Sequence, residues 1–246
     1  MEAKIQESRE PRTFKNVILA SYFNHTKDRQ RNKYWKPQNH DSYAKLRKSI
    51  NDKGIEFVVL SNTFMPHQED LFTIEQVKAD TRFTPNAFRW FAQLDWLEKH
   101  RPEKVFMLDI DDVEMWHDPF PHLEKGKLYA GYEYDKNMYH NWMWNRQAKY
   151  LAVDDWRQVV QKENGDKRLL NTGIFGGYTE DVIDFLQILT TNHKAYSPGL
   201  KTSSDMSLFN YTVLKYGYWD KIGWGSQVAS KFKKYEVGGD AWFRHK

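Results

Sequence analysis

The sequence predicts a single α/β domain with a mostly parallel central sheet. Apolar runs of strand length alternate with segments of helical periodicity, and no two-residue hairpin signal joins them. A chain of 246 residues is long enough to bury one large core, and it is short for two independent domains. Hydrophobic residues make up 40% of the chain and charged residues 28%, which is the balance of an ordinary globular protein.

The first 60 residues predict two strands with a helix between them. Residues 16–23 form a short apolar run with polar flanks, which indicates a buried strand. Residues 42–53 place apolar side chains on one helical face, and Gly54 is the expected C-cap of that helix. Residues 55–60 form the second apolar run. The order strand, helix, strand predicts parallel pairing through a crossover helix.

The middle of the chain predicts a further helix and a third strand, which ends in a cluster of acids. Residues 86–99 carry aromatic and leucine side chains at helical spacing, and residues 105–108 form an apolar strand. Three aspartates follow that strand directly: Asp109, Asp111 and Asp112. Open α/β sheets place their ligand sites at the carboxyl ends of parallel strands, so we expect these carboxylates at the rim of the sheet.

The remaining elements follow from the same patterns. Residues 128–132 predict a strand, and residues 169–177 predict a strand that ends in a glycine turn at Gly176 and Gly177. Helices are expected at 154–163, 180–192 and 205–216, with a loop at 193–204. Residues 1–13 are predicted to be a flexible leader, and residues 14–246 form the single domain.

Composition excludes several classes of site. There is no cysteine, which excludes disulfides, thiolate metal sites and cysteine nucleophiles. The net charge of +4 permits a polyanionic partner without requiring one. No run approaches the about 20 apolar residues of a membrane span, and the charged N-terminus lacks the apolar core of a secretory signal. We therefore expect a cytoplasmic protein.

The acidic cluster has the ligand chemistry of a divalent metal site. Hard cations prefer carboxylate oxygens, and Asp109 with Asp111 or Asp112 supplies two such ligands while leaving positions open for a diphosphate. A solvated acidic turn is the plain alternative. A second alternative is a resemblance to haloacid-dehalogenase-like phosphatases, in which Asp109 would be the nucleophile and Asp111 the acid/base. That family normally places this strand at the start of its domain, whereas here two strands precede it.

Four segments resemble the glycosyltransferases of the GT-A fold that carry a DxD motif, especially a group of phage and bacterial enzymes. They keep their usual order along the chain. The segments are 106–120, with spaced aspartates and an Asp-Pro-Phe step; 170–177, with Asn-x-Gly; 204–210, with Asp-x-x-x-x-Asn; and 243–246, with a late His and Lys. The resemblance implies a GT-A-like, Rossmann-like α/β/α domain that uses a nucleotide-sugar donor, with a UDP-sugar favoured. A phage enzyme would act in the host cytoplasm.

The resemblance also assigns roles to residues of this chain. As ligands of Mn²⁺ or Mg²⁺ it implies Asp109, Asp111, Asp112 and His245, although His245 lies near the chain end and is expected to fray until donor binds. For donor binding we expect Ala20, Ser21, Tyr22, Arg89, Asp111, Asn171, Thr172, Gly173 and Lys246. As catalytic residues we expect Asp205 and Asn171. Asp205 also has a plain alternative as the N-cap of its helix.

The acceptor is open at this stage. Trp142 and Trp144 are candidates for an acceptor platform, with burial as the alternative. A basic loop at 27–36, with Tyr34 and Trp35, is the candidate contact for a nucleic-acid acceptor, with an ordinary charged surface loop as the alternative. A modified-DNA acceptor, a protein or a glycan, and a non-catalytic nucleic-acid-binding protein therefore stay as alternatives.

Overall fold

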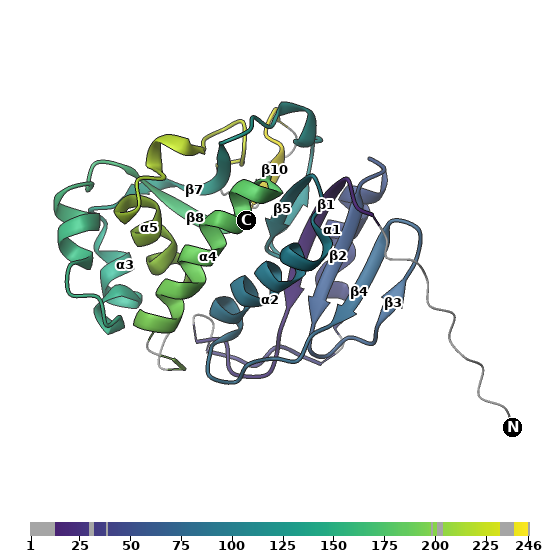
Figure 1. The fold of residues 1–246 in the computed structure, drawn as a ribbon, viewed down its shortest axis with the longest axis horizontal. Helices are drawn as coiled ribbons and strands as arrows, with labels where there is room; N and C mark the ends of the chain where they lie inside the picture. The colour runs from purple at the N-terminus through teal and green to yellow at the C-terminus, as the bar shows by residue number, and fades with distance from the viewer. Residues whose placement is uncertain are drawn as a thin grey trace, which may run out of the picture.

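The computed structural model describes residues 13–29, 32–37, 39–197, 199–200, 204–231 and 239–245. In this part of the chain an eight-stranded sheet has the order β3-β4-β2-β1-β5-β8-β7-β9 (Figure 1). Its strands are β1 Asn16–Tyr22, β2 Glu56–Ser61, β3 His67–Gln68, β4 Phe72–Gln76, β5 Lys104–Leu108, β7 Leu128–Asn137, β8 Arg168–Tyr178 and β9 Ile222–Gly223. Four of its seven pairings are parallel, which confirms the predicted α/β class and mostly parallel sheet.

A second, small sheet pairs β6 with β10, and helices fill the connections. The strands of the small sheet are β6 Val113–Met115 and β10 Phe243–His245. The α-helices are α1 Asp41–Asn51, α2 Pro85–His100, α3 Asn141–Arg146, α4 Thr179–Tyr196 and α5 Asp205–Lys215. Short helices of other types are η1 Phe120–His122, η2 Ala148–Tyr150, η3 Arg157–Lys162 and η4 Trp219–Lys221.

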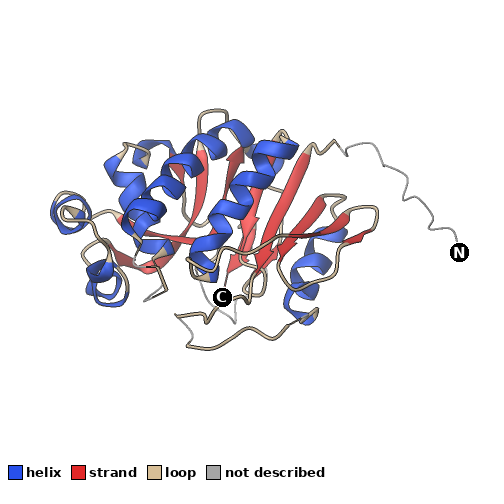
Figure 2. Ribbon diagram, turned by 60° about the horizontal axis from the view of Figure 1, so that its bottom comes forward, coloured by secondary structure: helices blue, strands red, loops and turns tan. Residues whose placement is uncertain are grey.

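Helices cover both faces of the large sheet, as Figure 2 shows. Along β1, Val17 and Leu19 join a core with α2, α4 and α5, whereas Ile18 and Ala20 join a core with α1 and the small sheet. Successive side chains of a strand point to opposite faces, so a strand covered on both faces must be apolar throughout. This explains why 16–23 and 55–60 are continuous apolar runs instead of alternating ones.

Strand β8 is an exception to the parallel order of β1, β2 and β5. This strand runs antiparallel to both β5 and β7, and Gly176 and Gly177 lie inside it, not in a turn after it. A Cβ at Gly176 would stand 2.3 Å from the backbone oxygen of Val105, so the glycine allows β5 and β8 to approach. The sequence does not indicate whether β8 runs parallel or antiparallel to its neighbours. Its connections are long, and a strand buried on both faces has the same apolar pattern in either direction.

Three helix predictions need adjustment. The segment predicted as a helix at 154–163 is a π-helical turn at η3. Helix α4 continues to Tyr196, so the first residues of the predicted 193–204 loop are helical. The C-cap of α1 is Asp52, and Gly54, with φ of +64°, closes the turn after it. None of the helices in the described ranges combines the length and hydrophobicity that a membrane crossing needs.

Candidate functional site

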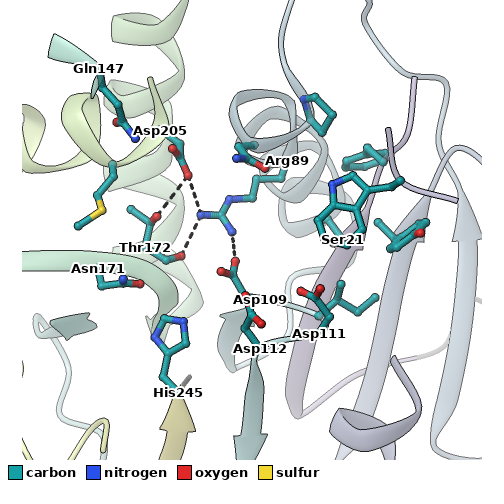
Figure 3. Close-up of a pocket in the computed structure, with 17 residues that line it drawn as sticks. Ser21, Arg89, Asp109, Asp111, Asp112, Gln147, Asn171, Thr172, Asp205 and His245 are labelled. Atoms are coloured by element: carbon teal, nitrogen blue, oxygen red, sulfur yellow. Dashed lines mark hydrogen bonds and ion pairs between the residues drawn. The ribbon is translucent and has the colours of Figure 1, made fainter. Parts of the chain in front are cut away.

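A pocket lies at the carboxyl edge of β1 and β5, facing the start of β8 and the N-terminus of α5 (Figure 3). Of the residues predicted from sequence, those that line it are Ser21, Tyr22, Arg89, Asp109, Asp111, Asp112, Asn171, Thr172, Asp205 and His245. Ala20 lies in the core beneath it and is fully buried. Lys246 lies outside the described residues. The fold therefore brings together side chains from six separate segments of the chain.

Arg89 joins the two halves of the pocket. It projects from the second turn of α2 and donates through Nη1 to Asp109 Oδ1. Its Nη2 donates to the backbone oxygen of Thr172 at 3.0 Å and to Asp205 Oδ2 at 3.3 Å. The Arg89 and Asp205 side chains are only 14% and 8% exposed, so these charges are largely withdrawn from water. A planar guanidinium can bridge two carboxylates in this way because its donors have a fixed fork geometry.

The Asp205 carboxylate faces the pocket. The N-cap of α5 is Ser204, and the Asp205 side chain accepts from Thr172 Oγ1 at 3.3 Å and from Arg89. The alternative of Asp205 as the helix N-cap is therefore wrong. A carboxylate in the first turn of a helix is stabilised by the partial positive charge of the helix terminus.

His245 is held against the acidic cluster by strand pairing. In the antiparallel pair of β6 and β10, His245 lies opposite Val113, the residue after Asp112. An ion pair between Arg244 and Glu114 at 3.3 Å supports the pair. His245 is 3% exposed, so the expectation of a frayed position was wrong.

Burial lowers the pKa of His245, while the charges of Asp109 and Asp112 oppose that shift. A neutral imidazole at neutral pH keeps a lone pair for a metal or a proton. Gly173 makes room for this ring. A Cβ there would stand 2.6 Å from His245 Nε2 and 3.0 Å from Asp109 Oδ2. The glycine predicted as a donor contact therefore keeps open the space between an imidazole and a carboxylate.

Asn171 uses both ends of its amide within the protein. Its Nδ2 donates to Glu133 Oε1 at 2.7 Å, and its Oδ1 accepts from the backbone N–H of Gly173 at 2.8 Å. Glu133 is 8% exposed and also accepts from Lys136 at 3.1 Å. Sequence reasoning missed Glu133, although a lone acid that continues the predicted strand 128–132 was a usable signal. Asn171 therefore orients Glu133 and the 171–173 backbone.

Tyr22 has little free ring surface. Its ring stacks on Phe64 with 4.8 Å between centroids, and its hydroxyl donates to the Lys36 backbone oxygen at 2.7 Å. Trp35 packs edge-on against Tyr22 at 6.0 Å and is itself a pocket residue, half-buried. An aromatic from the predicted basic loop therefore reaches the site.

The pocket also contains side chains that the sequence did not single out. Gln147 and Met206 line it beside Asp205, and Gln147 comes from the end of α3. Trp142 and Trp144 do not line it. Trp144 instead packs on Trp156 at 5.9 Å, and the Arg157 guanidinium lies 3.9 Å from its ring centroid.

In the part of the chain that the structure describes, no three His, Asp or Glu side chains are already arranged as a metal cage. The Asp109 carboxylate is turned to Arg89 instead. The fold and the pocket thus define an α/β protein with a charged pocket at the carboxyl edge of its sheet. The sequence matches no protein-family model, and it matches no curated protein.

Proposed function

We propose that the chain is a metal-dependent glycosyltransferase of the GT-A type that takes a nucleotide sugar, with a UDP-sugar favoured. One observation carries the proposal: the acidic cluster after β5, the late His245 and the Arg89–Asp205 pair share one pocket. The acidic cluster, Asp205 and His245 lie in the segments whose order along the chain resembles that family, and Arg89 bonds to two of their carboxylates. Their meeting in space is what a common catalytic role requires.

The residues present fit a divalent cation. Asp109 and Asp112 offer carboxylate oxygens, and His245 offers an imidazole whose burial favours its neutral form. The missing side chain at Gly173 leaves space between His245 and Asp109. Asp109, Asp112 and His245 would hold Mn²⁺ or Mg²⁺, with Asp111 beside them. A cation bound there would neutralise charge that develops on a leaving nucleoside diphosphate.

The other end of the pocket suits the sugar. Asp205 and Thr172 present a carboxylate and a hydroxyl there, and both bond to ring hydroxyls readily. Trp35, at the β1 side, supplies an aromatic ring next to the place proposed for the base, with Lys33 Nζ 4.4 Å from the ring centroid. In the reaction an acceptor hydroxyl attacks the anomeric carbon as the bond from that carbon to the diphosphate oxygen breaks. Arg89 and Asp205 orient the sugar for this step, and fixed orientation lowers the barrier.

The pocket volume is about 130 Å³, which is below the roughly 300–1,000 Å³ of sites that enclose a drug-sized ligand. A nucleotide sugar therefore extends past the pocket or widens it. Movement of Asp109 away from Arg89 would both widen the pocket and free a carboxylate oxygen.

The test is binding and slow hydrolysis of nucleotide sugars with and without Mn²⁺. We expect a UDP-sugar with Mn²⁺ to raise the melting temperature and to release UDP slowly on incubation. Asp109→Asn removes the charge that would hold the cation and should abolish both effects. Asp70→Asn, which removes the same charge at an exposed site near β4, should leave both unchanged.

The alternatives give different results in the same assays. A phosphatase would hydrolyse p-nitrophenyl phosphate and would not bind nucleotide sugars. A nucleic-acid-binding protein without catalytic activity would bind DNA with a steep salt dependence that survives Asp109→Asn. If no UDP-, GDP- or other nucleotide sugar shifts the melting temperature with any cation, the proposed function is wrong.

A further inference from the structure

Gln147 is a polar pocket residue to which the proposed function gives no role. It lies at the C-terminal end of α3, in the excursion between β7 and β8, and its side chain is 2% exposed. It nevertheless lines the pocket, and Figure 3 shows its amide end pointing toward Asp205. A buried amide must be hydrogen-bonded to offset the cost of its desolvation. The hydrogen-bond partners of the Gln147 amide therefore indicate its role.

One partner fixes which end of the amide faces the cavity. Gln147 Oε1 accepts from the backbone N–H of Ser207, in the first turn of α5, at 2.9 Å. A backbone N–H can only donate, so the oxygen must face the helix and Nε2 must face away from it. The Gln147 backbone is fixed as well, because its N–H donates to Met143 at 3.0 Å. Two N–H donors are thus presented at a set position.

These donors have no protein acceptor within the described residues. Among the residues that the structure describes, Gln147 Nε2 donates no hydrogen bond, whereas Oε1 accepts one from Ser207. The amide nitrogen therefore faces the pocket, where a ligand or a water completes its hydrogen bonds.

The neighbours of Nε2 select the chemistry of that ligand. Asp205 is an acceptor beside it, and Thr172 Oγ1 already donates to the same carboxylate. An anion would be repelled by Asp205, and a cation would find only N–H donors on Gln147. A hydroxyl fits both, because it accepts from an amide and donates to a carboxylate at the same time.

We propose that Gln147 and Asp205 together recognise one hydroxyl of the donor sugar, with Gln147 as the residue that sets sugar specificity. This inference rests on the proposed function. A sugar that lacks that hydroxyl would leave the Gln147 amide donors without an acceptor in the occupied site, and sites of this kind discriminate strongly against such analogues. In this proposal Gln147 does not contact the nucleoside diphosphate part of the donor.

Gln147→Glu is the sharpest variant. The new carboxylate keeps an oxygen for the Ser207 N–H, so the N-terminus of α5 stays capped, and it replaces the two N–H donors with an acceptor. We expect affinity for UDP with Mn²⁺ to stay within twofold of wild type and affinity for the best-binding UDP-sugar to fall at least tenfold. Gln76→Glu, at the exposed end of β4, makes the same charge change away from the site and should change neither.

Deoxy sugars separate hydroxyl recognition from a general charge effect. Among the 2-, 3-, 4- and 6-deoxy forms of that UDP-sugar, one should bind wild type at least tenfold more weakly than the parent sugar. In Gln147→Glu the difference in affinity between that deoxy form and the parent should be clearly smaller than in wild type, because the amide contact to the hydroxyl is gone and only the Asp205 contact remains.

Each other outcome overturns the inference in its own way. If Gln147→Glu binds the UDP-sugar like wild type, or loses UDP and the UDP-sugar equally, Gln147 does not read the sugar while the proposed function stands. If wild type binds neither nucleoside diphosphates nor nucleotide sugars with Mn²⁺, the proposed function and this inference fail together.

Discussion

Gly173 lies where the side chains of His245 and Asp109 approach each other. The importance of having no side chain at this position can be tested by substitution. A Cβ would meet His245 Cε1 at 2.4 Å and Nε2 at 2.6 Å, so Gly173→Ala must push the imidazole aside. We expect the fold to survive and Mn²⁺ affinity to fall at least tenfold, or about 1.4 kcal/mol. Calorimetric titration with Mn²⁺ and UDP measures the effect.

Gly176→Ala is the matched comparison on the same strand. There the new Cβ would meet the backbone oxygen of Val105 at 2.3 Å, and backbone inside a sheet cannot move aside as a side chain can. This variant should unfold at a clearly lower temperature than Gly173→Ala. Equal melting temperatures, or unchanged Mn²⁺ affinity in Gly173→Ala, would contradict the role given to Gly173.

His193 should make the protein sensitive to acid. It is fully buried in α4, its ring nitrogens have no hydrogen-bond partner within the described residues, and burial lowers its pKa to about 3. The unfolded chain takes up a proton near pH 6.5 and the folded chain does not, so stability is lost as pH falls below 6.5. Between pH 7.5 and 5.0 this one group costs about 2 kcal/mol.

Comparison with His193→Leu isolates that contribution from the other histidines. Urea unfolding at pH 7.5 and 5.0 should show a smaller loss of stability in the variant than in wild type, by about 2 kcal/mol. The same pH dependence in both proteins would mean that His193 is protonated when folded.

At the scale of elements, strand β10 positions His245 in the pocket, and the buried side chain of Phe243 holds this strand in place. This ring is fully buried and packs on Phe106 of β5 with 4.9 Å between centroids. Phe243→Ala should cost about 3–5 kcal/mol of unfolding free energy through the cavity it leaves, and it should weaken Mn²⁺ binding as the strand loosens.

His245→Ala is the control for that prediction. It should weaken Mn²⁺ binding as much while costing far less stability, because Phe243 still holds β10 in place. Urea unfolding and Mn²⁺ titration of both variants make the comparison. If Phe243→Ala leaves Mn²⁺ affinity unchanged, β10 does not position the imidazole.

Elements with long apolar runs could be predicted from the sequence, and very short ones could not. Strands β1, β2 and β5 and helices α2, α4 and α5 lie where periodicity places them. Strands such as β3 and β9 have two residues each and carry no periodic signal. They form because the neighbouring strand offers an edge to pair with.

Within the site, most of the residues that the sequence predicted belong to short motifs with a characteristic spacing, such as the aspartates after β5 and the Asn-x-Gly segment. Gln147 was missed because its partner is a backbone N–H on α5, 60 residues further along the chain. For Glu133 the only local signal was its place at the end of the predicted strand 128–132, because its contact with Asn171 lies across the β7–β8 pair. Contacts that depend on the tertiary fold leave little local pattern in the sequence.

At the scale of the whole molecule, the pocket joins the two halves of the chain. Ser21, Arg89 and Asp109 come from the first half, and Thr172, Asp205 and His245 come from the second. A ligand that contacts both halves should stabilise both. We expect UDP with Mn²⁺ to slow amide hydrogen exchange together in the first turns of α2 and α5 and in β10, and to leave α1 and β4 unchanged.

Hydrogen-exchange mass spectrometry with and without the ligands measures this directly. Slower exchange in α2 alone would place the ligand on one side of the pocket and would contradict a shared site. Slower exchange in α1 or β4 would indicate a general tightening of the fold.

The excursion between β7 and β8 starts and finishes at one place, since Asn137 and Arg168 are paired neighbours. Residues 138–167 could therefore be exchanged as a unit, provided that the insert keeps the buried apolar contacts of this excursion with Met206 and Tyr211 of α5. Gln147 lies in the exchanged unit, whereas the aspartates and His245 lie outside it. Under the proposed function, chimaeras made at this junction would vary the choice of sugar and keep the residues proposed for the cation.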